Sequence, residues 1–290
     1  MGELYALGVS DWLVRVLWDA VLQTTLQLVG FIGPFVLFGL LLHWFERVMQ
    51  LPLARRFGWG SVLWTGWLGA PIHELSHVVM CFIFSHRIDE LALFKPDRQT
   101  GRLGYVKHAY NPKNYFQVVG NLFIGLAPLL GGATVLYLMF RLFYPQAANQ
   151  AFEVAGMTQA IADADIPRAL SLMTQGSRNV IRHIVTADNL FTWQLWLFLY
   201  LTLCIGSHMP PSSSDYRGAT SGGILLLAVI FCGNVVFLAV GGQPIRLIAL
   251  VAPILGPALA LFMLCTALCG LAAVIVLLFT QLWDLVIASR

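Results

Sequence analysis

Long apolar stretches dominate this sequence and limit its fold more than any other feature. Each of six such stretches has about 20 residues or more, the length that an α-helix needs to cross the hydrocarbon core of a bilayer. In hydrocarbon every backbone polar group must be satisfied internally, and a helix meets this requirement. We therefore predict an all-α polytopic membrane protein with about six transmembrane helices. They cover residues 23–45, 60–84, 116–140, 190–209, 221–240 and 258–283.

The composition agrees with a membrane protein and argues against other classes. Hydrophobic residues make up 58% of the chain and charged residues 11%, whereas soluble domains carry about 25% charged residues. The net charge is only +3, and the chain has no Lys/Arg-rich block of the kind that binds nucleic acid. We therefore expect the lipid bilayer as a partner and no nucleic acid. The five cysteines lie in apolar stretches, so we expect them to be buried and free.

Residues 1–22 are predicted to form an amphipathic N-terminal helix. Asp11, Arg15 and Asp19 are spaced four residues apart and share one face, while apolar side chains form the other. A helix on the membrane surface fits this pattern, and continuation into the first span is the alternative. We expect no removable signal peptide, because the N-terminus lacks a cationic leader and a small-residue cleavage site.

Residues 23–290 are predicted to form a single transmembrane domain with two polar connections. In the first, 85–115, short alternating segments flank a turn, which is typical of a β-hairpin. The second, 141–189, is predicted as an extramembrane loop of mixed character with room for short helices. An additional apolar piece, 244–257, contains three prolines and is either a half-helix or a kinked entry to the last span.

Lysine and arginine positions bear on the orientation of the chain. Six basic residues between 85 and 115 favour a cytoplasmic hairpin by the positive-inside rule. Arg47, Arg55 and Arg56 are expected on the opposite side, because the predicted span 60–84 separates them from the hairpin, and the 141–189 loop would share their side. These residues argue for the opposite orientation, but the larger number of basic residues in the hairpin predicts that the hairpin is cytoplasmic.

A metal-binding motif, His73-Glu74-Leu75-Ser76-His77, lies inside the predicted span 60–84. Histidines four residues apart project from one face of a helix and can bind one zinc ion. A glutamate next to the first ligand can act as general base without binding the metal. Ionisable residues are costly at membrane depth and indicate a function there. We predict His73 and His77 as zinc ligands and Glu74 as the catalytic base; a hydrogen-bonded histidine pair or a non-catalytic metal site are the alternatives.

A catalytic zinc needs a third protein ligand and an open position for water. We predict Asp215, because Pro210 and Pro211 must break the preceding helix, and irregular backbone at membrane depth lies in protein or lines a wet cavity. His208 is the alternative ligand. The further candidates are Asp188, His86 and His108. The competing interpretation is that Asp215 only caps the next helix.

The chain resembles the site-2 protease family of intramembrane zinc metalloproteases. Three features match in order: the helix with the motif at 73–77 followed by a hairpin, a span with Gly120-Asn121-Leu122 and Ala127-Pro128, and a later span ending in a proline-rich segment with Asp215. The similarity covers roughly residues 60–220. Two departures indicate a divergent member. Ser76 replaces the family's usual glycine, and Tyr216-Arg217 separate the acidic ligand from Gly218.

The resemblance implies hydrolysis of peptide bonds in transmembrane protein substrates, as in regulated intramembrane proteolysis. It also implies a multi-pass protein of the bacterial inner membrane with its active site toward the cytoplasm. Asn121 would donate a hydrogen bond to the oxyanion or to the substrate backbone, and helix packing is its alternative role. The hairpin edge would hold an unwound substrate strand, or serve only as a connection.

Two other functions compete with proteolysis. One is a membrane scaffold that keeps the protease fold without cleaving peptides, and the intact motif argues against it. The other is a transporter, because polar residues and broken helices near the bilayer centre also mark solute pathways. Transporters often show matching broken helices in two halves of the chain, and this sequence shows no such pair. The sequence does not indicate an oligomeric state.

Overall fold

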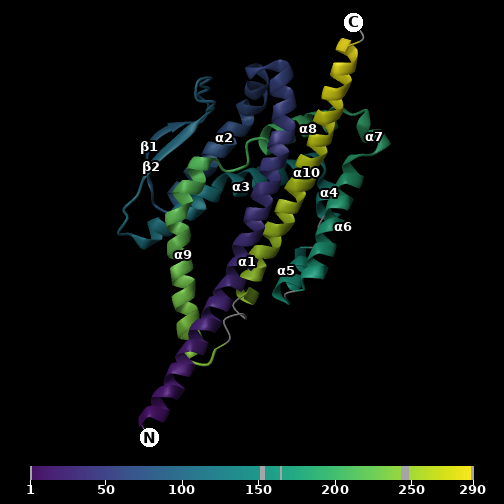
Figure 1. Cartoon of the computed structure of the whole chain (residues 1–290). Helices are drawn as coiled ribbons and strands as arrows, with labels where there is room; N and C mark the ends of the chain where they lie inside the picture. Colours follow the sequence, from purple (N-terminus) through teal and green to yellow (C-terminus); the bar gives the residue numbers. More distant parts are fainter. Residues whose placement is uncertain (1, 151–153, 164, 243–247, 289–290) are drawn as a thin grey trace.

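The computed structural model describes residues 2–150, 154–163, 165–242 and 248–288. Helices form most of it, and two strands form a small antiparallel sheet at one side (Figure 1). The elements are α1 (Gly2–Phe57), α2 (Trp59–Ile83), β1 (Arg87–Ala92), β2 (Tyr105–Ala109), α3 (Tyr115–Phe143), α4 (Pro145–Gln150), α5 (Val154–Ala162), α6 (Ile166–Ile184), α7 (Ala187–Leu190), α8 (Trp193–Gly206), α9 (Ser213–Ala239) and α10 (Ile248–Ala288). The prediction of a helical membrane protein with a small hairpin is confirmed at this level.

Four helices of the described chain, α1, α3, α9 and α10, are long and apolar enough to cross a membrane. The two other predicted spans, 60–84 and 190–209, correspond to α2 and α8. Helix α8 has 14 residues and is about 21 Å long, shorter than the roughly 30 Å of a hydrocarbon core. Helix α2 has 25 residues but carries the polar motif in its second half. The total of six spans stays a prediction.

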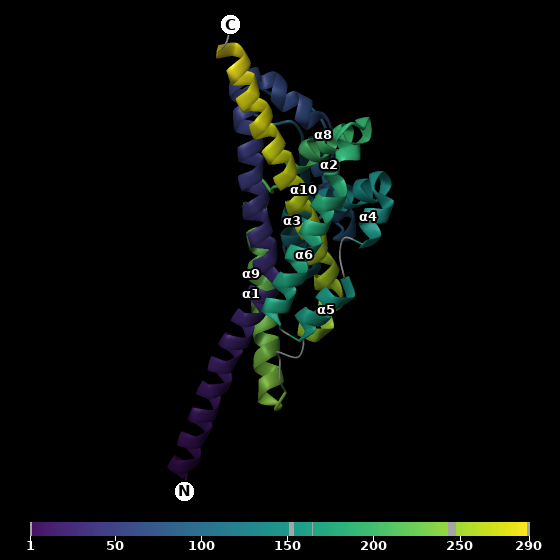
Figure 2. The ribbon, with the colours of Figure 1, turned by 90° about the vertical axis from the view of Figure 1, so that its right-hand side faces the viewer.

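Helix α1 joins the predicted N-terminal helix and the first predicted span without a break. The separate surface helix is therefore not seen, and the continuous alternative is. Its apolar part, Ser10–Phe57, has 48 residues and a length of about 72 Å, so one crossing leaves part of it outside the hydrocarbon. Figure 2 shows the N-terminal part bending away from the bundle. Pro34 inside α1 favours such a bend, because it removes a helix hydrogen bond.

The main hydrophobic core joins α1, α3, α10 and the end of α8. Phe38 of α1 stacks on Phe262 of α10, with ring centroids 5.4 Å apart. Ile72 of α2 packs against this core one residue before His73, so the motif lies at the border between core and cavity. The fully or almost fully buried members include Leu42, Leu129, Leu136, Ile205, Met209 and Cys265.

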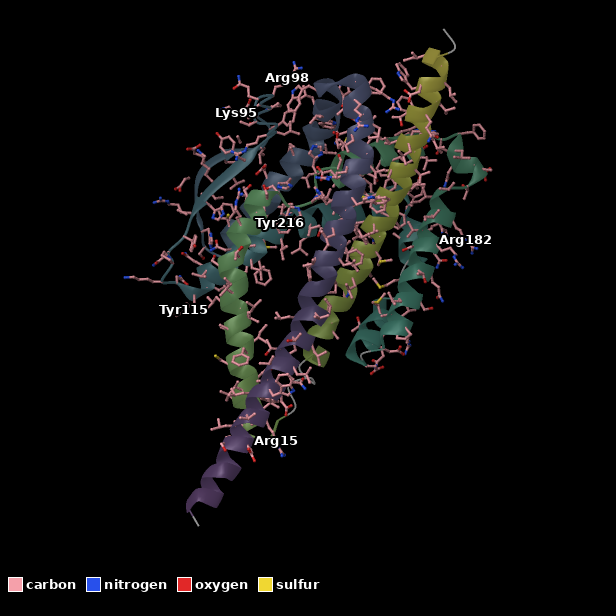
Figure 3. The ribbon with its side chains drawn as sticks, viewed as in Figure 1. Arg15, Lys95, Arg98, Tyr115, Arg182 and Tyr216 are labelled. Atoms are coloured by element: carbon pink, nitrogen blue, oxygen red, sulfur yellow. The ribbon has the colours of Figure 1, made fainter. Side chains whose placement is uncertain are left out.

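The hairpin folds back along α2 instead of leaving it. Ser85 adopts a positive φ of 56° directly after the helix and reverses the chain. Leu103, near the start of the second strand, packs so closely on Gly66 of α2 that a Cβ at Gly66 would clash with it. The tip of the hairpin, with Lys95 and Arg98, therefore lies toward the α1–α2 turn, as Figure 3 also shows.

This placement corrects the expectation for orientation. Arg55 at the end of α1 was expected across the membrane from the hairpin, because span 60–84 separates them in sequence. The hairpin runs back along α2, so its tip lies close to the start of α2. Trp59 and Val62 of α2 line the same cavity as Gly101 and Arg102 of the hairpin. Arg55 and the hairpin-tip residues Lys95 and Arg98 thus lie at one end of the molecule, whereas Arg87 lies at the base of the hairpin.

In the segment 141–189, predicted as an extramembrane loop, residues 141–143 end α3, and the described residues after them form the helices α4 to α7. Of these, α5 and α6 pack along α10, and α7 contacts α8 (Figures 1 and 2). Val180 and Ile184 of α6 are fully buried there. In the predicted piece 244–257, residues 244–247 lie outside the described residues; the rest belongs to α10, which contains Pro253 and Pro257, as in the alternative of a kinked entry.

The cysteines are all free thiols. Four of them are buried, as predicted, but Cys232 is exposed. It lies on α9, of which only a small part is covered by other helices. An apolar run alone does not distinguish contact with protein from exposure to the surroundings, which explains the wrong prediction for this residue.

Candidate metal centre

The helical spacing of four residues brings the two motif histidines together on α2. Their Nε2 atoms are 3.2 Å apart. The Nδ1 of His73 donates a hydrogen bond to the carbonyl oxygen of His208 at 2.7 Å, and the Nδ1 of His77 donates to that of Ile124 at 2.8 Å. Because a carbonyl only accepts, both Nδ1 atoms carry the proton. In the neutral rings, both Nε2 atoms therefore present lone pairs to the same point.

Asp215 completes this group from the first turn of α9. Its carboxylate oxygens lie 3.6 Å from the Nε2 of His73 and 3.4 Å from the Nε2 of His77. Ser212 forms a capping box with Asp215, and its backbone N–H donates to the carboxylate at 2.6 Å. Asp215 therefore caps α9 and faces the histidines at the same time, so the two interpretations of this residue are compatible.

With both Nδ1 atoms protonated and both rings neutral, no proton lies between the lone pairs of this group. Two unprotonated nitrogens and a carboxylate converge, with one donor atom of each residue within 4.8 Å of the others. Lone pairs at such distances repel one another unless a proton or a cation lies between them. Removing two imidazoles and a carboxylate from water is also costly unless their lone pairs are used. The donor set thus fits a metal cation.

Two consecutive residues of helix α3 contact both helices that supply the group, α2 with the histidines and α9 with Asp215. The carbonyl oxygen of Ile124 orients His77. At Gly125, a Cβ would lie 2.6 Å from the carbonyl oxygen of Asp215, so glycine is required for α9 to approach this closely. These contacts join residues far apart in sequence.

Ser76, where the family that the sequence resembles usually has glycine, is accommodated by Gly131 of α3. The Ser76 side chain occupies the space where a Cβ at Gly131 would lie. We therefore predict that Gly131→Ala destabilises the protein by about 1–3 kcal/mol through overpacking. Adding Ser76→Gly should recover part of this loss, although glycine itself costs a helix about 0.5–1 kcal/mol. Thermal unfolding of both single variants and the double variant in detergent measures the coupling; strictly additive effects would contradict the contact.

The other candidate ligands lie outside this group. The Nδ1 of His208 is 3.1 Å from the carbonyl oxygen of Cys204, and the hydrogen bond that joins His208 to His73 is made by the His208 backbone carbonyl. His86 and His108 pair with each other at the base of the hairpin. Asp188 lies in the short helix α7. Among the described residues, the group that could hold a metal consists of His73, His77 and Asp215.

Glu74 and Asn121 line a cavity of about 720 Å³, which is also lined by the candidate metal ligands His73, His77 and Asp215. Hairpin residue Gly104 packs over Glu74, because a Cβ at Gly104 would lie 2.8 Å from the Cγ of Glu74. Asn121 is buried, and its Nδ2 donates to the Oγ of Ser221 on α9 at 3.0 Å. This bond supports the helix-packing role of Asn121, while its position on the cavity wall leaves substrate contact open.

Comparisons with known proteins give no further information about this site. No family model, curated protein or solved structure matches the chain. The resemblance to site-2 proteases therefore rests on the motifs of the sequence.

Several polar residues that line the cavity lie outside the motifs, among them Glu46 and Gln50 of α1 and Arg102 of the hairpin. Glu46 accepts a hydrogen bond from His43 at 2.9 Å. The Oε1 of Gln50 is buried and has no hydrogen-bond partner among the described residues. The sequence could have indicated a role for Glu46, because this residue directly follows the apolar stretch 23–45, where an ionisable residue is unusual. Gln50 and Arg102 carry no comparable signal in the sequence.

Proposed function

We propose that this chain is an intramembrane zinc metalloprotease that hydrolyses peptide bonds of transmembrane protein substrates. The observation that carries the proposal is the convergence of His73, His77 and Asp215 on one point, with Glu74 on the wall of the same cavity. Two histidines and one carboxylate are a ligand set of hydrolytic zinc sites, which leave a further position open. Iron oxygenases use a similar set, so the identity of the metal must be measured.

Zinc held by these residues would supply a Lewis acid that polarises the scissile carbonyl and acidifies water. Glu74 would take the proton from the attacking water and deliver it to the amine nitrogen as the peptide C–N bond breaks. Asn121 would donate its remaining amide proton toward the carbonyl oxygen, where negative charge develops. His208 and Ile124 would keep both histidines oriented through their backbone carbonyls.

The hairpin would hold the substrate as an added strand. Eight consecutive residues, Gly101 to His108, line the cavity. Because side chains alternate between the faces of a strand, such continuous lining indicates that the chain turns its edge toward the cavity. In the described sheet, β2 pairs with β1 on one side only. An unwound substrate could therefore pair with the other edge and present a carbonyl to the metal centre.

The distribution of charge supports a cytoplasmic active site. Lys95, Arg98 and Arg55 gather at the end of the molecule where the hairpin tip meets the α1–α2 turn. By the positive-inside rule, this end would face the cytoplasm. The location in a bacterial inner membrane belongs to the same proposal and follows from the family resemblance.

The metal is tested by elemental analysis of the purified protein. Wild type is expected to contain about one zinc per chain, and the double variant His73→Ala/His77→Ala almost none, because it keeps one of three ligands. His183→Ala is a matched control, since His183 is exposed on α6 and bonds only locally to Asn179. Stoichiometric metal in the double variant would place the site elsewhere, and iron in wild type would exclude the zinc assignment.

Cleavage of co-expressed candidate membrane substrates tests the activity. A protease should release fragments from at least one substrate, and chelation should stop the reaction until zinc is restored. A scaffold would bind zinc and the substrate without cleaving it. A transporter would instead move a solute across proteoliposomes in a manner that depends on the same residues.

A further inference from the structure

A second histidine pair lies at the base of the hairpin and has no role in the proposed reaction. His86 follows α2, and His108 lies in β2, with their Nδ1 atoms 3.0 Å apart. His108 lines the cavity that contains the metal-binding group. His108 pairs with Ile88 of β1. The register of the two strands shifts between Ile88 and Glu90, so His108 lies opposite a β-bulge. Such bulges redirect side chains and are common beside active sites.

The hydrogen bonds determine which nitrogens carry protons. The Nε2 of His86 lies 2.9 Å from the carbonyl oxygen of Gln117 and must donate to it. A neutral His86 then has an unprotonated Nδ1, which accepts a hydrogen bond from the Nδ1–H of His108. The Nε2 of a neutral His108 is left as an acceptor. Burial lowers the pKa of His108 and favours its neutral form; the neighbouring His86 acts in the same direction, and Asp215 acts in the opposite one.

The surroundings hold this pair rigidly. His86 is only 6% exposed, and Tyr110 stacks on its ring at 5.3 Å. The side chain of Gln117 connects both ends of the hairpin: its Nε2 donates to the Ser85 carbonyl at 2.6 Å, and its Oε1 accepts from the Asn111 N–H at 2.6 Å. An acceptor fixed in this way has already lost its conformational entropy before it meets a ligand.

We propose that His108 contacts the substrate of this site, accepting through its Nε2 a hydrogen bond from a backbone N–H of the bound peptide, and that His86 is its positioning residue. The inference rests on the proposed protease function. A strand added along β2 would present amide protons at the cavity wall, where a fixed nitrogen acceptor can select extended backbone over helix. Helical segments keep most of their N–H groups in internal bonds.

The test measures peptide binding separately from cleavage. The probe is a fluorescent transmembrane peptide of about 20 leucine and alanine residues with a central Gly-Pro pair, which favours local unwinding. Its Kd is measured in the Glu74→Gln background, where cleavage cannot consume it. His108→Phe keeps a ring without the acceptor and should weaken binding about tenfold, the equivalent of one hydrogen bond. His108→Gln supplies an oxygen near the Nε2 position and should restore most of the affinity.

Controls separate this role from others. His86→Phe should weaken peptide binding to the same extent, because His86 positions His108. This variant tests the proposed hydrogen bond of His108 even if His108→Phe does not fold. Arg87→Ala, an exposed hairpin substitution, should leave the Kd unchanged. Zinc content should stay at about one per chain in all variants, and in the cleaving enzyme His108→Phe should raise KM more than it lowers kcat. An unchanged Kd in both phenylalanine variants, or zinc loss in His108→Phe, would overturn the inference. Absence of cleavage by wild type would instead refute the protease function.

Discussion

Replacing Glu74 with glutamine is expected to abolish cleavage of a transmembrane substrate while leaving zinc content and expression unchanged. Glutamine keeps the size of the side chain but cannot accept the proton of water, and positioned acid–base groups typically contribute about 10²–10⁴-fold to a rate. Glu74 lies on the cavity wall and outside the group that could hold the metal, so the metal should remain. Fragment release from a co-expressed substrate, together with elemental analysis, measures both effects.

A matched control for this variant is Glu90→Gln. Glu90 is an exposed carboxylate on β1 that pairs with Lys107 at 2.9 Å, and it does not line the cavity. Its substitution should leave cleavage close to the wild-type rate. Wild-type turnover in Glu74→Gln would rule out the proposed role of Glu74.

The second large effect is expected at the third ligand. Mutation of a residue that only hydrogen-bonds to a metal ligand typically lowers metal affinity by roughly 10- to 100-fold. Asp215→Ala removes a ligand itself, so it should weaken zinc binding by more than this. His208→Ala should keep most of the zinc, because the alanine variant still has the backbone carbonyl that accepts from His73. Competition with a chelator of known affinity measures both constants. Loss of zinc in His208→Ala with retention in Asp215→Ala would reverse the assignment.

Asp215→Asn separates the two roles of this residue. Asparagine can still accept the backbone hydrogen bond of Ser212 and keep the cap, whereas alanine would also cost the helix about 1 kcal/mol. If Asp215 acts as a ligand, both variants should bind zinc poorly, although asparagine should preserve thermal stability better. Normal zinc affinity in Asp215→Asn would indicate that this residue serves only as a cap.

Much of the architecture followed from local patterns. Apolar stretches of membrane-spanning length predicted α1, α3, α9 and α10, because a helix satisfies its backbone within one segment. The spacing of His73 and His77 predicted a shared face, because the period of a helix is local. The hairpin was predicted from alternation and a turn. The boundary between the N-terminal helix and the first span was not, because no helix-breaking residue separates them.

Only the tertiary structure decided how these pieces meet. Whether Asp215 or His208 faces the motif histidines depends on where α9 packs on α3, and that packing depends on Gly125, which lies 90 positions before Asp215. The return of the hairpin along α2 required the fit of Leu103 on Gly66, and it placed the hairpin tip, with Lys95 and Arg98, beside the α1–α2 turn. The tautomers of both motif histidines depended on carbonyls of distant helices. Local periodicity determines which residues share a face, but only contacts between elements determine what that face meets.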